Sequence, residues 1–205
     1  EPAVSRIGLF GGTFDPVHRA HVALAESALA ALALDLVRWV PTGQPWQKAG
    51  TRAVTPAVHR VAMVQTAIAH EPRFVLERIE VERAGPSFTL DTVRALQAAE
   101  PGHAWVLLIG QDQYANLHTW RDWRELLGRV ELAVANRPGP PQPPHPEVLA
   151  HPHRMVPLPM LDISSTQIRA AAALGHDLVP MVPPEVARYI DQHRLYAGDD
   201  PAPRS

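Results

Sequence analysis

The chain has 205 residues, of which 46% are hydrophobic, and 19 basic side chains stand against 21 acidic ones. This composition predicts a folded protein with a substantial core and gives no electrostatic reason to expect nucleic-acid or membrane-surface binding. The absence of cysteine excludes disulfides, thiolate metal sites and a cysteine nucleophile, and fits a cytoplasmic protein. No apolar run reaches the roughly 18 residues of a membrane-spanning helix, and we expect no signal peptide before the first strand.

The first element is an apolar run, Ile7 to Phe10, which predicts a buried strand and ends in the pair Gly11-Gly12. Glycine permits a positive φ, and it lets a ligand approach the backbone because it carries no Cβ. A turn follows, and from Arg19 the chain becomes rich in alanine and leucine, which predicts a helix over 19–33. Strand, glycine turn and helix N-terminus together are typical of an anion-binding site.

Two histidines stand at the start of that expected helix, where their spacing places both on one face. His18 and His21 are three residues apart, and two imidazoles beside an anion site indicate phosphate chemistry. The glycines fit neither the G-x-G-x-x-G dinucleotide pattern nor a Walker loop. A glycine turn and a His-x-x-His spacing are each common alone, so the prediction of a functional site depends on their combination.

The next segment predicts a second strand at 36–40 and a loop over 41–48. Ligands of open α/β sheets lie beyond the carboxyl ends of strands, so this loop should face the same crevice as the glycine turn. Lys48 can then reach a phosphate, although a solvated loop lysine is the alternative. A helix with Thr55 as N-cap and Pro56 at its first position should run to residue 69. A third strand is expected at 74–76, continued by 79–81.

The middle of the chain contains the clearest central strand, an unbroken apolar run at 104–109 that suits a parallel sheet covered on both faces. Before it, a helix is expected over 90–99, with Ser87 and Thr89 as ordinary cap residues. After it comes Gly110, and then Asp112, whose carboxylate is placed to bond a ribose hydroxyl. Trp120, ahead of a helix that ends near 127, either packs in the core or stacks on a flat ligand ring. A fifth strand follows at 130–135.

Proline dominates the stretch after the fifth strand, and residues 137–153 therefore predict an extended, exposed loop. His145, His151 and His153 are irregularly spaced, which favours solvated loop histidines over a metal site. A last short strand is expected at 155–158.

A second candidate anion site lies near the C-terminus, where hydroxyl side chains precede an alanine-rich helix. Ser164 or Ser165 is the natural N-cap, and Arg169 follows one turn later. Helix N-terminus, hydroxyls and guanidinium together suit phosphate, and a plain cap with a surface arginine is the alternative. A final helix should open near 182–185 and end near 193, and residues 197–205 should fray.

Both end motifs resemble a known superfamily, the nucleotidyltransferases with a His-x-Gly-His motif. The resemblance rests on the stretch from Gly11 to His21 and on the stretch from Ile163 to Arg169. Two middle segments, 83–92 and 109–120, look like those of bacterial nicotinate-nucleotide adenylyltransferases, and the resemblance covers residues 6–196. The chain departs from the family pattern at Ala20, where glycine is usual, and at Gln47, where a histidine is usual.

The resemblance implies a single nucleotidyltransferase domain over 1–205. We expect a doubly wound, mostly parallel Rossmann-like α/β sheet with a C-terminal phosphate-binding helix and helical extension over 163–196. The implied reaction joins ATP and nicotinate mononucleotide to give nicotinate adenine dinucleotide and pyrophosphate, with Mg²⁺ carried by the ATP phosphates rather than by a protein metal site. The implied partners are these two substrates, with no nucleic acid or membrane, and the protein is expected to be a monomer or weak homo-oligomer.

Site residues follow from the same resemblance. The catalytic residues would be His18, His21, Arg169 and Lys48, and nicotinate mononucleotide would contact Lys48, Thr89, Trp120 and Arg137. Two alternatives stay open: a sister adenylyltransferase acting on nicotinamide mononucleotide or phosphopantetheine, and a non-catalytic nucleotide-binding protein on the same fold. The residues expected to bind ATP are Gly11, Gly12, Thr13, Phe14, His18, His21, Gly110, Asp112, Ile163, Ser164, Ser165 and Arg169.

Overall fold

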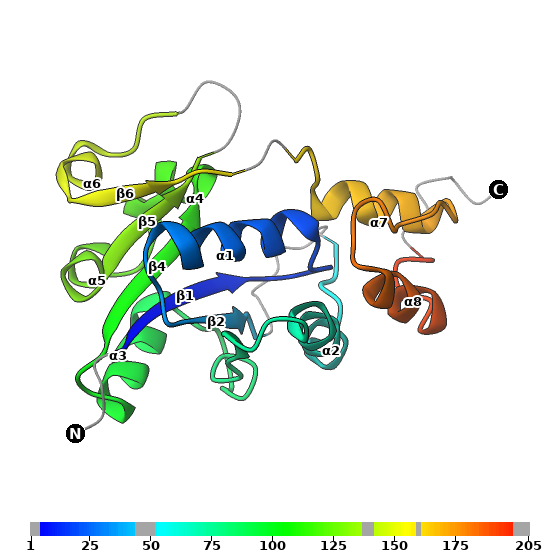
Figure 1. Cartoon of the computed structure of the whole chain (residues 1–205), viewed down its shortest axis with the longest axis horizontal. Coiled ribbons are helices and arrows are strands. Elements are labelled where there is room, and N and C mark those ends of the chain that lie inside the picture. Colours follow the sequence, from blue (N-terminus) through cyan, green and yellow to red (C-terminus); the bar gives the residue numbers. More distant parts are fainter. Residues whose placement is uncertain (1–4, 44–51, 137–141, 159–160, 199–205) are drawn as a thin grey trace.

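The computed structural model describes residues 5–43, 52–136, 142–158 and 161–198, and its strands form one parallel sheet in the order β3-β2-β1-β4-β5-β6. The apolar runs of the sequence form the central strands, which are buried because helices cover both faces of the sheet. Figure 1 shows the sheet running through the larger part of the molecule. The strands are β1 (Arg6–Gly12), β2 (Leu36–Pro41), β3 (Phe74–Leu76), β4 (Ala104–Gly110), β5 (Glu131–Ala135) and β6 (His153–Val156).

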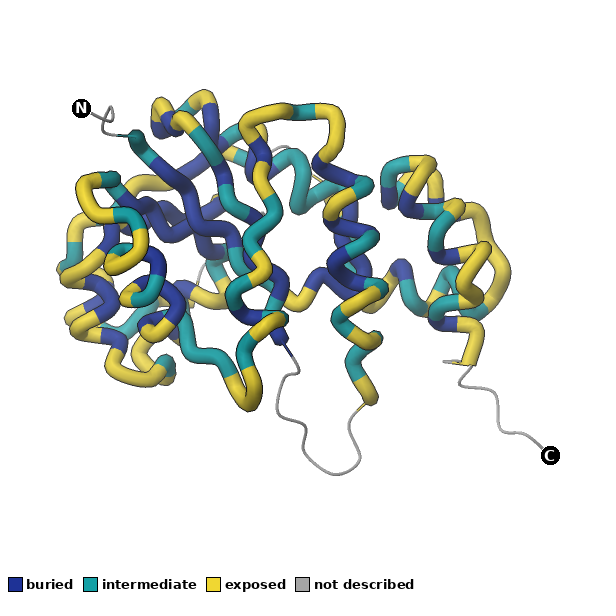
Figure 2. Tube along the Cα trace, turned by 90° about the horizontal axis from the view of Figure 1, so that it is seen from below, coloured by how far each residue is buried: buried dark blue, intermediate teal, exposed yellow. Residues whose placement is uncertain are grey.

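Helices cover both faces of this sheet, so the predicted doubly wound α/β fold is confirmed. One apolar core joins the sheet to α1, α2, α7 and α8, and a second joins its other face to α3 and α5. Figure 2 shows the strands as the most deeply buried part of the chain. The helices are α1 (Arg19–Ala31), α2 (Ala57–Ile68), α3 (Thr89–Ala99), α4 (Gln111–Ala115), α5 (Trp123–Arg129), α6 (Pro146–Ala150), α7 (Ser165–Ala173) and α8 (Pro184–Gln192), with a 3₁₀ turn at Leu117–Thr119.

The strand order reverses between β1 and β4, which are neighbours at the centre of the sheet. From β1 the chain builds outward through β2 and β3, then returns to β4 and builds the other half. In such sheets the connections at the carboxyl ends of the two central strands diverge and leave a crevice for a ligand. The fold therefore directs attention to the ends of β1 and β4, at Gly12 and Gly110.

The glycine pair differs from the expectation of a positive φ, because Gly11 and Gly12 continue β1 as extended strand. The left-handed residue of this turn is Phe14, with φ 51°. A Cβ on Gly12 would lie 3.1 Å from the Phe14 ring, whereas a Cβ on Gly11 would meet only the Val40 carbonyl oxygen, at 3.8 Å. The need for glycine at these two positions therefore comes from the space that a side chain would fill and not from the backbone conformation.

Three predicted boundaries in the first half are wrong. Residues 79–81 form a turn rather than strand, because β3 stops pairing with β2 after the Glu77 N–H donates to the Trp39 carbonyl. Thr55 does not cap α2: its N–H donates to Asp15, and Pro56 is the N-cap. Thr89 does not cap α3 either but is the first residue of that helix.

The expectation of an exposed loop over 137–153 is wrong for its second half. Pro146 occupies the first turn of α6, where its missing N–H costs nothing, and the His145 side chain caps that helix by accepting from the Glu147 N–H at 3.1 Å. The last strand, β6, begins at His153 and ends at Val156, two residues earlier than predicted. Residues 137–141 lie outside the described ranges.

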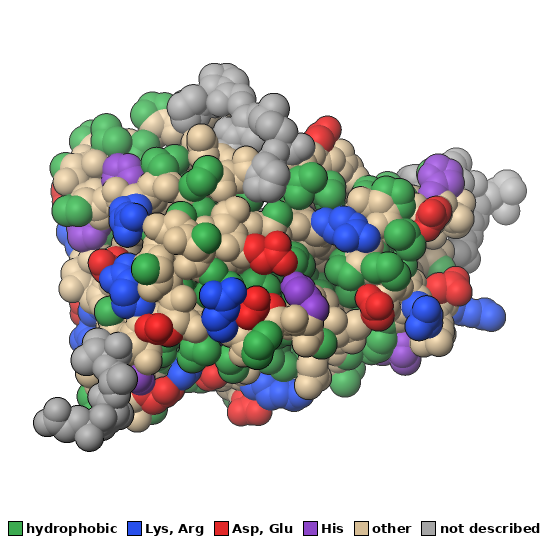
Figure 3. Space-filling view, in the orientation of Figure 1, with side chains coloured by type: hydrophobic (Ala, Val, Ile, Leu, Met, Phe, Trp, Pro, Cys, Tyr) green, Lys and Arg blue, Asp and Glu red, His purple; other side chains and the backbone are tan. Residues whose placement is uncertain are grey.

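On the face drawn in Figure 3, basic and acidic side chains are interspersed. No helix within the described ranges is long and apolar enough to cross a membrane. The assignment of all 205 residues to a single domain stays a prediction. Helices α7 and α8 lie together at one end of the molecule in Figure 1, where the sequence predicted a C-terminal helical extension.

Candidate active site

Two pockets lie at the carboxyl ends of the central strands, and the glycine pair stands between them. The larger has a volume of about 640 Å³ and is lined by the ends of β1 and β4, the start of α1 and the segment that leads into α7. The smaller, of about 210 Å³, opens toward α3 on the other side of β1. Gly11, Gly12 and Gln113 line both pockets, so the pockets adjoin at the end of β1, where the two glycines contribute no side chain.

His18 and His21 face the larger pocket as a stacked pair whose ring centroids are 3.7 Å apart. Their Nδ1 atoms cap α1: His18 Nδ1 accepts from the Ala20 N–H at 3.2 Å, and His21 Nδ1 accepts from the His18 N–H at 3.0 Å. A neutral imidazole that accepts at Nδ1 carries its proton on Nε2. The cap therefore fixes the tautomer and leaves each ring with one Nε2–H donor.

Burial keeps both histidines neutral. It lowers the pKa of His18 to about 4, and burial together with the nearby His18 ring lowers the pKa of His21 well below 6.5. The Phe14 ring packs edge-on against His21, with centroids 5.0 Å apart. Phe14 is buried in the core and lines neither pocket, so it supports the His21 ring from behind. The pair presents preorganised neutral donors to the larger pocket.

The start of α7 closes the opposite wall of that pocket. Ser164 caps the helix through the Gln167 N–H at 3.1 Å, as predicted, and Ser164, Ser165 and Ile163 line the pocket. The positive end of the helix dipole therefore faces the space in front of the histidines. Arg169 lies behind this wall and lines neither pocket; its guanidinium donates to the Asp15 carbonyl at 2.9 Å.

The end of β4 supplies the third wall. Gly110 and Asp112, both predicted to bind ATP, line the larger pocket at the start of α4. Gln113 was missed by the sequence analysis: its Oε1 accepts from the Gly110 N–H at 3.0 Å, and it lines both pockets. The spacing of Gly110 and Gln113 is that of a capping box, which could have revealed it.

The smaller pocket combines an apolar wall with a few polar groups. Thr89 and Trp120, both predicted to bind the mononucleotide, line it together. Glu80, which the sequence analysis missed, is buried there and accepts from the Thr92 hydroxyl at 2.8 Å; burial raises its pKa, against the effect of that hydrogen bond. The Thr42 hydroxyl is buried at this pocket and has no hydrogen-bond partner among the described residues.

A buried arginine holds together the backbone segments that border the smaller pocket. Arg60 is fully buried and donates to the carbonyls of Thr13, Thr42, Gly43 and Thr55 at 2.7–3.0 Å. Thr13 and Thr42 line the pocket, so this guanidinium fixes the ends of β1 and β2 relative to each other and to the start of α2. Burial lowers its pKa, and the nearby Asp15 and Tyr196 raise it.

The remaining predictions concern two basic side chains and the histidines that were considered as metal ligands. Lys48 and Arg137 lie outside the described ranges. Within those ranges no group of three or more His, Cys, Asp or Glu side chains is arranged to hold a metal ion. Of the three histidines near the proline-rich segment, His145 caps α6, and His153 lies in β6 within 3.4 Å of the Tyr114 hydroxyl.

This arrangement suits the transfer of a nucleotidyl group. Neutral imidazole donors and a helix N-terminus line a pocket large enough for a nucleotide, and a second pocket adjoins it at the glycine pair. The profile of the cytidylyltransferase-like family matches residues 9–171. A nicotinic acid mononucleotide adenylyltransferase of Plasmodium falciparum, solved in complex with NaAD, has the same fold: the TM-score is 0.77 at 19% identity, over 94% of this chain and 98% of that one.

Relatives with higher sequence identity show which family of nucleotidyltransferases the chain belongs to. A probable nicotinate-nucleotide adenylyltransferase of Methylibium petroleiphilum is 52% identical over 198 residues, which cover 94% of this chain and 92% of the relative. A protein of the same name from Bordetella petrii is 46% identical over 94% of this chain and its own full length. The chain belongs to the nicotinate-nucleotide adenylyltransferase family.

Proposed function

We propose that this nicotinate-nucleotide adenylyltransferase of NAD biosynthesis binds ATP in the larger pocket and nicotinate mononucleotide in the smaller one. The observation that carries the proposal is the shared wall. Gly11 and Gly12 border both pockets and place no side chain between them. An acceptor phosphate on one side can therefore reach an ATP phosphate on the other.

Transfer then needs positioning and charge stabilisation rather than a base. An oxygen of the mononucleotide 5′-phosphate attacks the α-phosphorus of ATP in line; the bond from that phosphorus to the bridging oxygen of the β-phosphate breaks, and pyrophosphate leaves. The nucleophile is already an anion, so no proton has to be removed from it. His18 and His21 donate from Nε2 to phosphate oxygens, and these donors gain strength as charge moves toward the leaving pyrophosphate.

The rest of the ATP site follows the walls of the larger pocket. Ser164 and Ser165 at the start of α7 face the β- and γ-phosphates, with Arg169 behind them, and Asp112 receives a ribose hydroxyl. Mg²⁺ would arrive with ATP as part of that substrate, neutralising phosphate charge. The hydrogen-bond donors at the start of α7 suit the phosphate oxygens of such a substrate.

The acceptor site follows the smaller pocket. Trp120 can stack on the pyridine ring, and Thr89 and the unpartnered Thr42 hydroxyl can bond its substituents. Lys48 and Arg137 remain predicted contacts of the mononucleotide phosphate and ring. The cytoplasmic location and the monomeric or weakly associated state also remain predictions.

Turnover with three acceptors tests the assignment. Pyrophosphate release would be measured with ATP and nicotinate mononucleotide, nicotinamide mononucleotide or phosphopantetheine. We expect the highest kcat/KM with the nicotinate compound. A preference for either of the others would place the chain's substrate among the sister adenylyltransferases, and no release with any acceptor would support the non-catalytic alternative.

A further inference from the structure

Asp15 lies at a junction of segments that are far apart in the sequence. Its carboxylate is 2% exposed, and Oδ1 accepts from the Tyr196 hydroxyl at 2.5 Å. Oδ2 accepts from the Arg52 guanidinium at 2.7 Å and from the Thr55 N–H at 3.0 Å. These hydrogen bonds outweigh burial and hold the pKa of Asp15 below its ordinary value. One carboxylate thus joins the C-terminal segment to the approach to α2.

The backbone at this carboxylate also holds α7. The Asp15 carbonyl accepts from the Arg169 guanidinium at 2.9 Å, and the Pro16 carbonyl accepts from the Ser165 hydroxyl at the same distance. Ser165 lines the ATP pocket. A shift of the loop at 13–16 would therefore move the phosphate-facing start of α7 with it.

Two residues of the junction have backbones that L-amino acids rarely adopt. Phe14 has φ 51° and Tyr196 has φ 67°. Left-handed conformations cost bulky residues free energy and persist only where the surroundings determine them. Phe14 is held by its packing among buried rings, and Tyr196 by its buried hydrogen bond to Asp15. The strained positions thus mark where the C-terminal segment meets the site loop.

We propose that Tyr196 is a positioning residue for adenylyl transfer. Its hydroxyl fixes Asp15, and the carbonyls of the Asp15–Pro16 segment then hold Arg169 behind the wall of the larger pocket and Ser165 on that wall, where ATP phosphates would bind. Tyr196 itself lines neither pocket, so any effect on bound ATP has to pass through the residues that it holds, Asp15 first among them. The inference rests on the proposed function, since it assigns the phosphates to the larger pocket.

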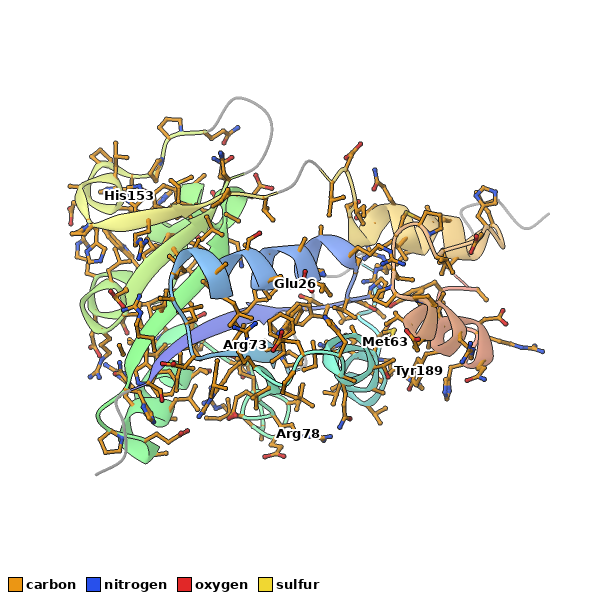
Figure 4. The ribbon with its side chains drawn as sticks, viewed as in Figure 1. Glu26, Met63, Arg73, Arg78, His153 and Tyr189 are labelled. Atoms are coloured by element: carbon orange, nitrogen blue, oxygen red, sulfur yellow. The ribbon has the colours of Figure 1, made fainter. Side chains whose placement is uncertain are left out.

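Tyr196→Phe tests it against a matched control, Tyr189→Phe. Tyr189, labelled on α8 in Figure 4, also makes a tyrosine hydrogen bond, at 2.8 Å with His59 Nδ1, but it lines neither pocket. We expect Tyr196→Phe to lower kcat about tenfold while the Kd for ATP, measured by calorimetry, rises about threefold. Tyr189→Phe should change neither. Equal kcat and equal Kd in the two variants would overturn the proposal.

A double-mutant cycle with Arg169→Lys supplies a readout that a purely structural role would not move. If Tyr196 acts through Asp15 on Arg169, the losses in kcat or in ATP affinity should overlap, and the double variant should be less impaired than the product of the single effects. Multiplicative losses would refute the coupling. The ATP affinities decide this even if nicotinate mononucleotide gives no turnover, an outcome that would count against the proposed function alone.

Discussion

The two pockets of this protein are built differently, although they share the end of β1. In the larger one, the groups that face the ligand are fixed before it arrives: His18 and His21 cap α1, Ser164 caps α7, and Gln113 holds the start of α4. The smaller pocket is mostly apolar and leaves the Thr42 hydroxyl unpartnered among the described residues. Under the proposed assignment, the transfer chemistry depends on donors that are held in place before ATP binds, whereas recognition of the acceptor depends on the shape of the smaller pocket and on a few polar groups.

Removing a donor from the larger pocket should produce the largest effect. We expect His21→Ala to lower kcat by about 10²–10³, a loss of about 3–4 kcal/mol of transition-state stabilisation, with a much smaller change in ATP binding. His145→Ala is the matched control, because it removes a histidine that also accepts a backbone hydrogen bond at a helix start but lines neither pocket. Steady-state kinetics decide; an unchanged kcat would remove His21 from the catalytic role.

Loosening the frame of the smaller pocket should come next. Arg60→Lys cannot satisfy four carbonyls in the fork geometry of a guanidinium, so we expect the free energy of unfolding to fall by about 3 kcal/mol. Because Thr13 and Thr42 lose their support, KM for the mononucleotide should rise more than KM for ATP. Arg129→Lys, an exposed pair with Glu125, should stay within about 1 kcal/mol of the wild type in urea titrations. Equal losses in the two variants would mean that Arg60 holds no such frame.

The neutral state of the histidines predicts a pH dependence of stability. The folded pKa of His18, about 4, lies below its ordinary 6.5, so the unfolded chain binds the proton first as pH falls. The contribution of neutral His18 to the free energy of unfolding is therefore complete above about pH 6.5 and is lost toward pH 4. Between pH 7 and 5 the loss is about 2 kcal/mol. His18→Asn, which retains a capping side chain, should flatten the profile of unfolding free energy by that amount. A profile parallel to that of the wild type would show that His18 is not buried as described.

The acceptor side should show the smallest effect. Trp120→Ala should raise KM for nicotinate mononucleotide about tenfold and leave KM for ATP nearly unchanged, because only one stacking surface is lost. Trp120→Phe should recover most of the affinity. Equal losses for both substrates would identify Trp120 as a core residue and remove the distinction between the two pockets at this position.

The order of helices and strands could be predicted because the signals are local. The apolar run of β4 and the alanine-rich helices are legible along the chain. The stretch 79–81 misled because Ile-Glu-Val alternates like a strand, yet Glu80 turns inward to bond Thr92. In the proline-rich stretch 137–153 the error was the opposite one, because a helix was missed. Pro146 resembles a helix breaker in the sequence but occupies the first turn of α6.

The same difference between local and distant signals applies to the residues of the candidate site. Ser164 was predicted because a capping residue acts on backbone a few positions away, and His18 and His21 were predicted because residues three apart at a helix start share one face. The Asp15–Tyr196 contact joins residues 181 positions apart, and Arg60 collects carbonyls from three segments. No local pattern encodes such contacts, because they exist only once the chain has folded.

The glycine pair between the pockets has a consequence for inhibition. If the two substrates bind as we propose, the dinucleotide product lies across Gly11 and Gly12, with one half in each pocket. A synthetic two-armed compound with a thin linker at that crossing would occupy both sites at once and compete with both substrates. Resistance by a larger side chain at Gly12 would be difficult to acquire, since a Cβ there already meets the Phe14 ring that supports His21.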